Sequence, residues 1–285
     1  MLFDDNLNLG KLQKNWRLVV WWILHRLTTP LRAMPDFLIV GTQKGGTTSL
    51  FNYLIQHPRV YAPFRKEIKF FDSNYFNGLS WYQAHFPLRR KLERERALTG
   101  EATPYYMFHP TAPERISQAL PEVRIIVLLR NPVDRAYSHY QHMVRAGRET
   151  LSFEEALEKE SERLDGEAEK IAADMYYPQA AHIYYSYLAR GRYIEQLPKL
   201  FSLFSPEHVL VLRSEDLYTS PRETFFQTLD FLKLPRWEPP KYEVFKQGTY
   251  DKTLDPKLRQ RLAEYFRPYN RQLYDFLGRD FEWDK

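Results

Sequence analysis

A glycine- and threonine-rich stretch follows the first short apolar run of the chain. The run Phe37–Val40 leads into GTQKGGTTS at positions 41–49, and residues 51–56 then have a helical pattern. Glycines allow backbone N–H groups to turn inward, and the positive end of a helix N-terminus stabilises an anion. Lys44 adds a positive charge, and the paired threonines offer hydroxyls. Glycine-rich turns also occur without ligands, but this combination predicts a site for a phosphate-like anion.

The spacing of this loop differs from that of a Walker A nucleotide-binding loop. In that motif, G-x-x-x-x-G-K-[ST], a lysine directly follows the second glycine. Gly41 and Gly46 have the required separation, but Thr47 occupies the lysine position and the lysine comes earlier, at Lys44. The next apolar run ends in Arg130 rather than in an aspartate that could help to hold Mg²⁺. The loop is therefore predicted to bind phosphate without a metal ion.

A second cluster surrounds that arginine. Residues 124–138 are RIIVLLRNPVDRAYS, an apolar run that ends in Arg130 and continues into a helix. An arginine at the exit of a strand can make a bidentate contact with a phosphate, and Ser138 lies two helical turns further on. Arg130 could instead pair with a carboxylate, and Ser138 could belong to the surface. Taken alone, this cluster leaves the choice open.

The order of apolar runs and helix starts indicates the fold class. Apolar runs at 37–40, 125–129 and 209–212 predict buried strands, and helical patterns separate them. This alternation predicts a P-loop-like, three-layer α/β/α domain with a central parallel sheet. Ligands bind beyond the carboxyl ends of the strands in such sheets. Helix starts are predicted at Asn131-Pro132, Ser220-Pro221 and Asp255-Pro256, and at a capping box of Ser152 and Glu155.

The composition limits the classes of partner and compartment. The 285-residue chain has a net charge of +5 and a pI of about 9.1, which favours a polyanionic ligand without choosing among nucleotides, glycans and membranes. There are no cysteines, which excludes disulfides and thiolate metal sites. An ordinary reducing cytoplasm therefore suffices for this protein. No cluster of metal-ligating residues is evident in the sequence.

The stretch Leu18–Leu24 is the candidate membrane segment of the sequence. It is far shorter than the roughly 20 apolar residues that a membrane span needs. No small-residue cleavage site follows it, so we do not expect a signal peptide. We expect residues 1–34 to form an N-terminal helical extension that docks on the body of a cytoplasmic protein. The alternative is weak peripheral contact with a membrane surface through Trp21 and Trp22.

The two phosphate-type clusters together resemble sulfotransferases that use 3′-phosphoadenosine-5′-phosphosulfate (PAPS). The loop Gly41–Thr48 resembles their 5′-phosphosulfate loop, and the strand with Arg130 and Ser138 resembles their 3′-phosphate motif. The resemblance runs from Pro35 to Trp283 and is strongest to bacterial sulfotransferases and the heparan sulfate branch. It implies one sulfotransferase domain over residues 35–285. It also implies sulfuryl transfer from PAPS to an acceptor hydroxyl or amine, with PAP as product and no metal ion.

The resemblance further implies which residues bind the donor. Lys44 would contact the bridging oxygen and neutralise charge on the departing phosphate, while Arg130 and Ser138 would bind the 3′-phosphate. A late loop, residues 246–250, resembles the segment that closes over the nucleotide in this family. The predicted donor-binding residues are Thr42, Gln43, Lys44, Gly45, Gly46, Thr47, Thr48, Ser49, Arg130, Ser138, Lys246, Gly248, Thr249 and Tyr250.

A third cluster, KEIKFFD at positions 66–72, resembles the K-E-x-x-F-F segment of the heparan sulfate branch, whose glutamate is the base. The resemblance implies that Glu67 takes the acceptor proton as the new S–O bond forms. The two phenylalanines would pack and fix the segment, and a surface pair of Glu67 with Lys69 is the structural alternative. That branch often has His at the position of Lys69 and Lys at that of Ala102, so this chain departs from it twice.

Several alternatives remain open in the sequence. His109 is the rival base, because cytosolic sulfotransferases use a histidine. The rival functions are a P-loop kinase or nucleotidase, against which the position of Lys44 argues, and a non-catalytic polyanion-binding protein of the same fold. The acceptor stays open between a saccharide, a lipid headgroup and another small metabolite, as do O- versus N-sulfation and the oligomeric state. We expect no nucleic-acid partner.

Overall fold

The computed structural model describes residues 24–245 and 254–284 and has one parallel β-sheet at its centre. The strands follow the order β2-β3-β1-β4-β5 across the sheet, and every pair of neighbours runs parallel. β1 is central, and the chain passes from its β3 side to its β4 side. Ligands of such sheets bind at this kind of switch point. The strands are β1 (Phe37–Gly41), β2 (Val60–Tyr61), β3 (Leu98–Ala102), β4 (Arg124–Leu129) and β5 (Val209–Arg213).

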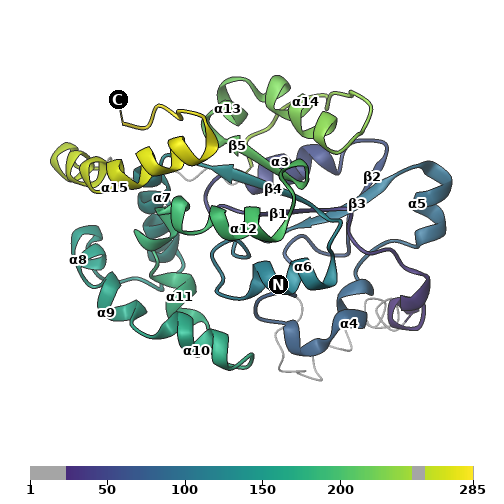
Figure 1. Ribbon diagram of the computed structural model, residues 1–285, viewed down its shortest axis with the longest axis horizontal. Coiled ribbons are helices and arrows are strands. Elements are labelled where there is room, and N and C mark those ends of the chain that lie inside the picture. Colours follow the sequence, from purple (N-terminus) through teal and green to yellow (C-terminus); the bar gives the residue numbers. More distant parts are fainter. Residues whose placement is uncertain (1–23, 246–253, 285) are drawn as a thin grey trace.

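Helices fill the connections between these strands (Figure 1). The α-helices are α3 (Thr47–Leu54), α4 (Leu79–Gln83), α5 (Arg89–Glu95), α6 (Ala112–Ala119), α7 (Pro132–Arg145), α8 (Phe153–Glu158), α9 (Glu160–Leu164), α10 (Glu167–Ala173), α11 (Ala180–Tyr184), α12 (Leu197–Leu203), α13 (Ser214–Thr219), α14 (Pro221–Phe231) and α15 (Pro256–Leu277). Short 3₁₀ helices are η1 (Thr29–Leu31), η2 (Tyr75–Asn77), η3 (Ala189–Gly191), η4 (Tyr193–Glu195) and η5 (Pro206–His208).

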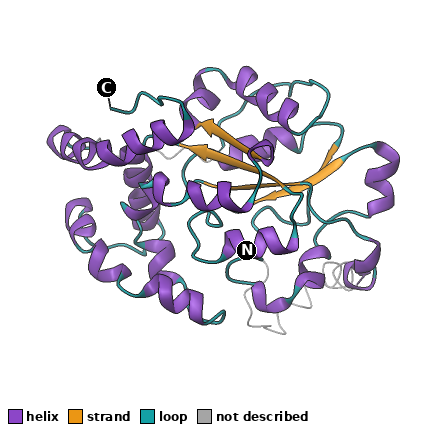
Figure 2. Cartoon of the chain, in the orientation of Figure 1, coloured by secondary structure: helices purple, strands orange, loops and turns teal. Residues whose placement is uncertain are grey.

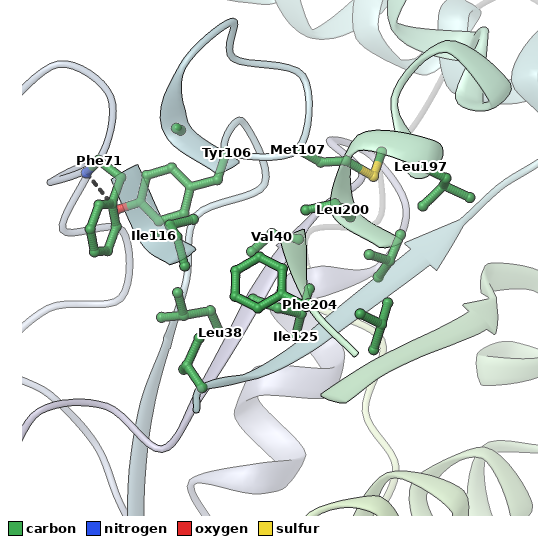
Figure 3. Packing of buried hydrophobic residues seen from close by; sticks show 14 of the residues in the cluster. Leu38, Val40, Phe71, Tyr106, Met107, Ile116, Ile125, Leu197, Leu200 and Phe204 are labelled. Carbon is green, nitrogen blue, oxygen red and sulfur yellow. Dashed lines mark hydrogen bonds between the residues drawn. The ribbon is translucent and has the colours of Figure 1, made fainter. Parts of the chain in front are cut away.

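Two hydrophobic cores cover the two faces of the sheet and make the three layers. Successive side chains of a strand point to opposite faces. Phe37 and Ile39 of β1 accordingly pack with residues of α3 and α14, whereas Leu38 and Val40 pack with residues of α6 and α12. Figure 3 shows the second core, with Leu197 and the neighbouring apolar residues of α12 packed over β1 and β4. The predicted P-loop-like α/β/α fold is confirmed.

A helical lobe lies beyond the carboxyl ends of the strands, on the side to which the arrowheads point in Figure 2. Its core is formed where α7 packs against α8 and α15. Val133 and Met143 of α7 share one hydrophobic cluster with Phe153 of α8 and Phe266 of α15. The loops that leave β1 and β4 therefore open toward this lobe. The sheet supplies one wall of the space where ligands are expected, and the lobe supplies another.

The strands predicted from apolar runs are confirmed, with β1, β4 and β5 each one residue longer than expected. Asn131 and Asp255 cap their helices through side-chain oxygens, and Ser152 and Glu155 form the predicted capping box. Ser220 precedes α14 but makes no side-chain cap. The helix that follows β1, α3, begins at Thr47, earlier than its sequence pattern indicated. β2 and β3 were not predicted.

The described part of the N-terminal extension contacts the body through polar groups. The His25 ring nitrogen Nδ1 lies 3.0 Å from the carbonyl oxygen of Ala84, and Arg32 Nη1 donates to the carbonyl oxygen of Phe86 (2.6 Å). Through these contacts the described residues of this segment lie beside the end of α4. Trp21 and Trp22 lie outside the described residues. None of the helices within the described ranges is both long and apolar enough to cross a membrane.

Candidate active site

The loop between β1 and α3 has the backbone of an anion-binding turn. Lys44 and Gly46 have left-handed φ angles of 70° and 91°, which turn the chain sharply ahead of α3. Gly46 is the N-cap of α3 and leaves its first-turn N–H groups without a side-chain cap. A Cβ at Gly45 would lie 2.7 Å from the carbonyl oxygen of Leu128, so only glycine fits there. These features suit a bound phosphate group.

Hydroxyl groups line the same turn. The Thr42 Oγ1 atom is buried and has no hydrogen-bond partner among the described residues, while its backbone N–H donates to the Leu128 carbonyl oxygen (2.9 Å). Thr47 is buried and Thr48 half-buried at the start of α3. Ser49 is fully buried, and its hydroxyl oxygen accepts a hydrogen bond from the Phe245 N–H (3.1 Å). Ser49 thereby anchors a distant segment of the chain beside the loop.

The structure brings the two phosphate-type clusters together. Arg130, directly after β4, donates from Nη1 to the carbonyl oxygen of Lys44 (3.0 Å). The Tyr193 hydroxyl donates to the carbonyl oxygen of Arg130 (2.7 Å), which fixes the backbone at the strand exit. Asn131 then caps α7 by accepting the Val133 N–H. Ser138 lies two turns into α7 and is buried. The predicted residues of both clusters therefore lie at one end of the sheet.

Arg190, in η3, is a site residue that the sequence did not reveal. Its guanidinium group is fully buried, donates to the side chain of Gln43 and lies over the rings of Tyr105 and Phe108. Burial lowers the pKa of Arg190 to about 9, so it stays charged at neutral pH. It therefore adds positive potential behind the loop. Only the folded chain places it there, because no local pattern links it to Gln43.

Glu67 lies in an irregular segment between β2 and η2, near the carboxyl end of β3. Its carboxylate is about one-third exposed and forms an ion pair with Lys66 (3.2 Å). Lys69 is exposed and has a left-handed φ of 56°. Phe70 and Phe71 are buried in the core, which confirms their predicted packing role. Glu67 is therefore held at the surface by a segment whose aromatic residues are anchored beneath it.

Buried carboxyl groups accompany this segment. Asp72 is buried and accepts the Ser73 N–H (2.5 Å), and burial raises the pKa of its carboxyl group to about 6. Glu101, in β3, is also fully buried, and burial raises the pKa of its carboxyl group to about 7. Hydrogen bonds to Glu101, including one from the Ile68 N–H (3.2 Å), act in the opposite direction.

The geometry of His109 is that of a helix cap. The ring is buried, and its Nδ1 atom accepts the backbone N–H groups of Thr111 and Ala112, both at 3.1 Å, at the start of α6. Burial lowers the pKa of His109 to about 3, so the ring is neutral. Because Nδ1 accepts two hydrogen bonds, the single proton of the neutral ring sits on Nε2. No ring nitrogen then remains to accept a proton from a substrate.

The remaining predicted donor-binding residues, Lys246, Gly248, Thr249 and Tyr250, lie outside the described residues. Phe245, which directly precedes them, contacts Ser49 of α3. Among the described residues, no group of three or more His, Asp or Glu side chains could hold a metal ion.

The fold and the loop at its centre define an α/β protein with a site suited to a phosphate group. A model of the sulfotransferase domain matches residues 34–255, and the chain belongs to the sulfotransferase family. Sulfotransferases of this family use PAPS as the donor. The chain is therefore a transferase that moves a sulfuryl group, rather than a P-loop kinase or nucleotidase.

Relatives support the same assignment. The chain is 33% identical to a sulfotransferase from Alicyclobacillus acidocaldarius, with a TM-score of 0.69 over 89% of this chain and all of that one. It is 30% identical to mouse heparan sulfate glucosamine 3-O-sulfotransferase 6, covering 89% of this chain and 75% of that protein. It is 26% identical to the membrane-associated sulfotransferase kil1 of Dictyostelium discoideum, over 89% of this chain and 67% of that protein.

Proposed function

We propose that this sulfotransferase transfers the sulfuryl group of PAPS to a hydroxyl of a saccharide by in-line displacement, without a metal ion. Lys44 acts on the leaving group and Glu67 is the general base. The observation that carries the proposal is the contact between Arg130 and the backbone of Lys44, which joins the two phosphate-type clusters into one site. A site with two phosphate positions suits a nucleotide that carries both a 5′-phosphosulfate and a 3′-phosphate.

The residues around the loop fit this donor. Gly45 lets the backbone of the turn pack closely against the Leu128 carbonyl oxygen, and the Thr42 hydroxyl is buried with no partner among the described residues, as a group that awaits a ligand would be. The N–H groups in the first turn of α3 have no side-chain cap, and such groups at a helix N-terminus suit a bound anion. We propose that Arg130 and Ser138 hold the 3′-phosphate. Gln43 accepts a hydrogen bond from Arg190, which helps to keep the β1–α3 loop in this conformation.

The proposed chemistry conserves atoms and charge. The acceptor oxygen forms a bond to sulfur while the bond between sulfur and the bridging phosphate oxygen breaks. Glu67 takes the proton that the acceptor hydroxyl releases. The Lys44 ammonium group and the backbone N–H groups of the loop stabilise the negative charge that develops on the departing phosphate. The protein therefore contributes mainly positioning and electrostatic stabilisation.

The geometry of His109 supports Glu67 as the base. His109 uses Nδ1 to cap α6 and keeps its proton on Nε2, so it can accept no further proton without losing the cap. Glu67 is partly exposed at the carboxyl end of the sheet, where an acceptor can reach it. The carboxylate of Glu67 can therefore meet substrate, whereas the ring of His109 is committed to structure.

Relatives that act on heparan sulfate support a saccharide acceptor, since the mouse relative is named for the glucosamine of heparan sulfate. Lys69 and Ala102 stand where the heparan sulfate branch often has His and Lys. Because of these two differences from the heparan sulfate branch, we propose saccharide hydroxyls in general as the substrate class, rather than heparan sulfate in particular.

Transfer of labelled sulfate tests this function. The purified protein, ³⁵S-PAPS and excess EDTA are incubated with desulfated heparan sulfate, or with a polar extract of the source cells, and labelled products are identified by mass spectrometry. We expect label in a saccharide and full activity in EDTA, because lysine and backbone N–H groups supply the positive field. Loss of activity that Mg²⁺ alone restores would contradict the metal-free mechanism. Label in a lipid or phenol would contradict the proposed acceptor.

We also propose that the protein works in the cytoplasm with weak peripheral contact to membranes. Leu24, Leu27 and Leu31 lie at helical spacing and are 54%, 74% and 65% exposed, although the opposite side of this segment docks on the body. The basic residues Arg89 and Arg90 are exposed at the start of α5, directly after Leu88, which forms an isolated backbone bridge with Arg32 of this segment. Apolar side chains beside basic ones suit an anionic lipid surface.

Vesicle binding tests this proposal. Leu27→Glu replaces the most exposed of the three leucines with a charge, and we expect its binding to phosphatidylserine-containing vesicles to fall by about tenfold, since one leucine no longer enters the interface. Val144→Glu is the control, because it also replaces an exposed apolar residue with an acidic one but lies on α7. It should bind the vesicles as the wild type does. Equal binding by wild type and Leu27→Glu, or no binding by either, would remove the membrane contact from the proposal.

A further inference from the structure

The segment that carries Glu67 lacks the backbone pairing of a helix or a strand. Between β2 and η2 the chain runs through residues 62–74 without regular structure. Buried N–H groups in such a segment need other partners. Ile68 donates its N–H to Glu101 Oε2 (3.2 Å), and Phe70 and Phe71 donate theirs to the Tyr106 hydroxyl oxygen (2.9 and 3.4 Å). Figure 3 shows the contact between Phe71 and Tyr106.

The Glu101 carboxylate and the Tyr106 hydroxyl form one saturated network. Glu101 accepts hydrogen bonds from the Tyr82 hydroxyl (2.8 Å), the Tyr106 hydroxyl (3.0 Å), the Thr103 hydroxyl (2.9 Å) and the Ile68 N–H. These four donors use the acceptor positions that a carboxylate has. Tyr106 donates its one proton to Glu101 and accepts two N–H groups, which uses its full capacity as well.

This network is placed where a small displacement would matter. Ile68 directly follows Glu67 in the chain, so the bond to Glu101 fixes the peptide next to the proposed base. The rings of Phe70 and Phe71 lie against those of Tyr82 and Tyr106, with centroids 4.7 and 5.6 Å apart, which holds the same segment from the core side. A reacting group displaced by about 1 Å can cost 10²-fold in rate.

We infer that Glu101 and Tyr106 are positioning residues for sulfuryl transfer, because together they bind the backbone of Ile68, Phe70 and Phe71 and so hold Glu67 toward the acceptor. This inference rests on the proposed role of Glu67. Glu101 lies at the carboxyl end of β3, next to the strand that leads into the phosphate-binding loop. The network therefore links the segment of the base to the sheet that positions the donor.

A matched pair of tyrosines separates positioning from simple stability. Tyr82 and Tyr106 are both fully buried and both donate to Glu101 Oε1, but only Tyr106 also accepts backbone N–H groups of the base segment. We expect Tyr106→Phe to lower kcat for ³⁵S transfer from PAPS to desulfated heparan sulfate by about 30- to 100-fold with PAP affinity unchanged. Tyr82→Phe should lower kcat by less than about threefold at a similar thermal stability.

Hydrogen exchange measures the positioning without any acceptor. In the PAP complex, the amides of Phe70 and Phe71 should exchange at least about tenfold faster in Tyr106→Phe than in Tyr82→Phe, because only the former leaves them without an acceptor. If Tyr106→Phe does not fold, Glu101→Gln replaces it, with faster exchange expected at Ile68. Equal exchange in the compared variants would overturn the inference, as would equal kcat values for the two tyrosine variants.

The base assignment fails on a different measurement. Glu67→Gln could keep wild-type turnover while the exchange difference is present. The network would then hold the segment, but Glu67 would not be the base, and the inferred positioning role would be wrong. If Glu67→Gln loses turnover and the exchange difference is absent, the proposed function stands and only the inference from Glu101 and Tyr106 is overturned.

Discussion

Glu67→Gln is expected to lower kcat by about 10² to 10⁴-fold while PAP binds as tightly as to the wild type. Glutamine keeps the size and hydrogen bonding of the side chain but cannot take a proton at neutral pH, and general base catalysis typically contributes that range. Donor affinity should not change, because the residues proposed to hold the nucleotide belong to other elements, the β1–α3 loop and the exit of β4. Steady-state kinetics and PAP titration measure the two quantities separately.

His109→Ala is the control for that experiment. The substitution removes an acceptor for the N–H groups of Thr111 and Ala112, so we expect it to destabilise the fold by about 1 kcal/mol, as loss of a helix cap does, and to leave kcat within a few-fold of wild type. If His109→Ala abolished transfer while Glu67→Gln stayed active, the base would be His109. If both variants stayed active, the acceptor would be acidic enough to need no base, as a phenol is.

The parts of the fold that could be predicted are those in which local sequence and burial agree. β1 and β4 are continuous apolar runs because both of their faces are buried, and each is followed by residues whose types suit a phosphate. The same rule explains why β3 was not predicted. Its sequence, LTGEA, has no apolar run, because Gly100 lies against β1, where a Cβ would come within 2.5 Å of the Phe37 carbonyl oxygen.

The rest of β3 depends on contacts between distant parts of the chain. Glu101 can be buried in the strand only because Tyr82 and Tyr106 supply hydroxyl groups. No local pattern in the sequence predicts that these two tyrosines contact Glu101. Arg190 is a similar case, since its partner Gln43 is far away along the chain. The motifs themselves could therefore be recognised in the sequence, whereas the buried polar groups that hold them in place could not.

Lys44→Met is expected to impair turnover far more than donor binding, and Arg130→Ala to do the reverse. Methionine keeps the length of the lysine side chain but removes the charge that is proposed to face the departing phosphate. Loss of one such stabilising group costs about 10² to 10³-fold in kcat. PAP, which already carries the full phosphate charge, should lose only a modest part of its affinity, because the N–H groups of the loop and of α3 remain.

Arg130→Ala instead removes a charge-assisted contact that is proposed for the 3′-phosphate in every state of the reaction. We expect a loss of roughly 1.5–3 kcal/mol in PAP binding, about 10- to 150-fold in Kd, with little change in the affinity for 5′-AMP, which lacks that phosphate. Arg124→Ala, at the other end of β4, is the matched control and should bind PAP as the wild type does. Wild-type protein that binds PAP and 5′-AMP equally would refute a site with two phosphate positions. Equal losses of kcat and of PAP affinity in Lys44→Met would show that this lysine binds the donor without acting on the leaving group.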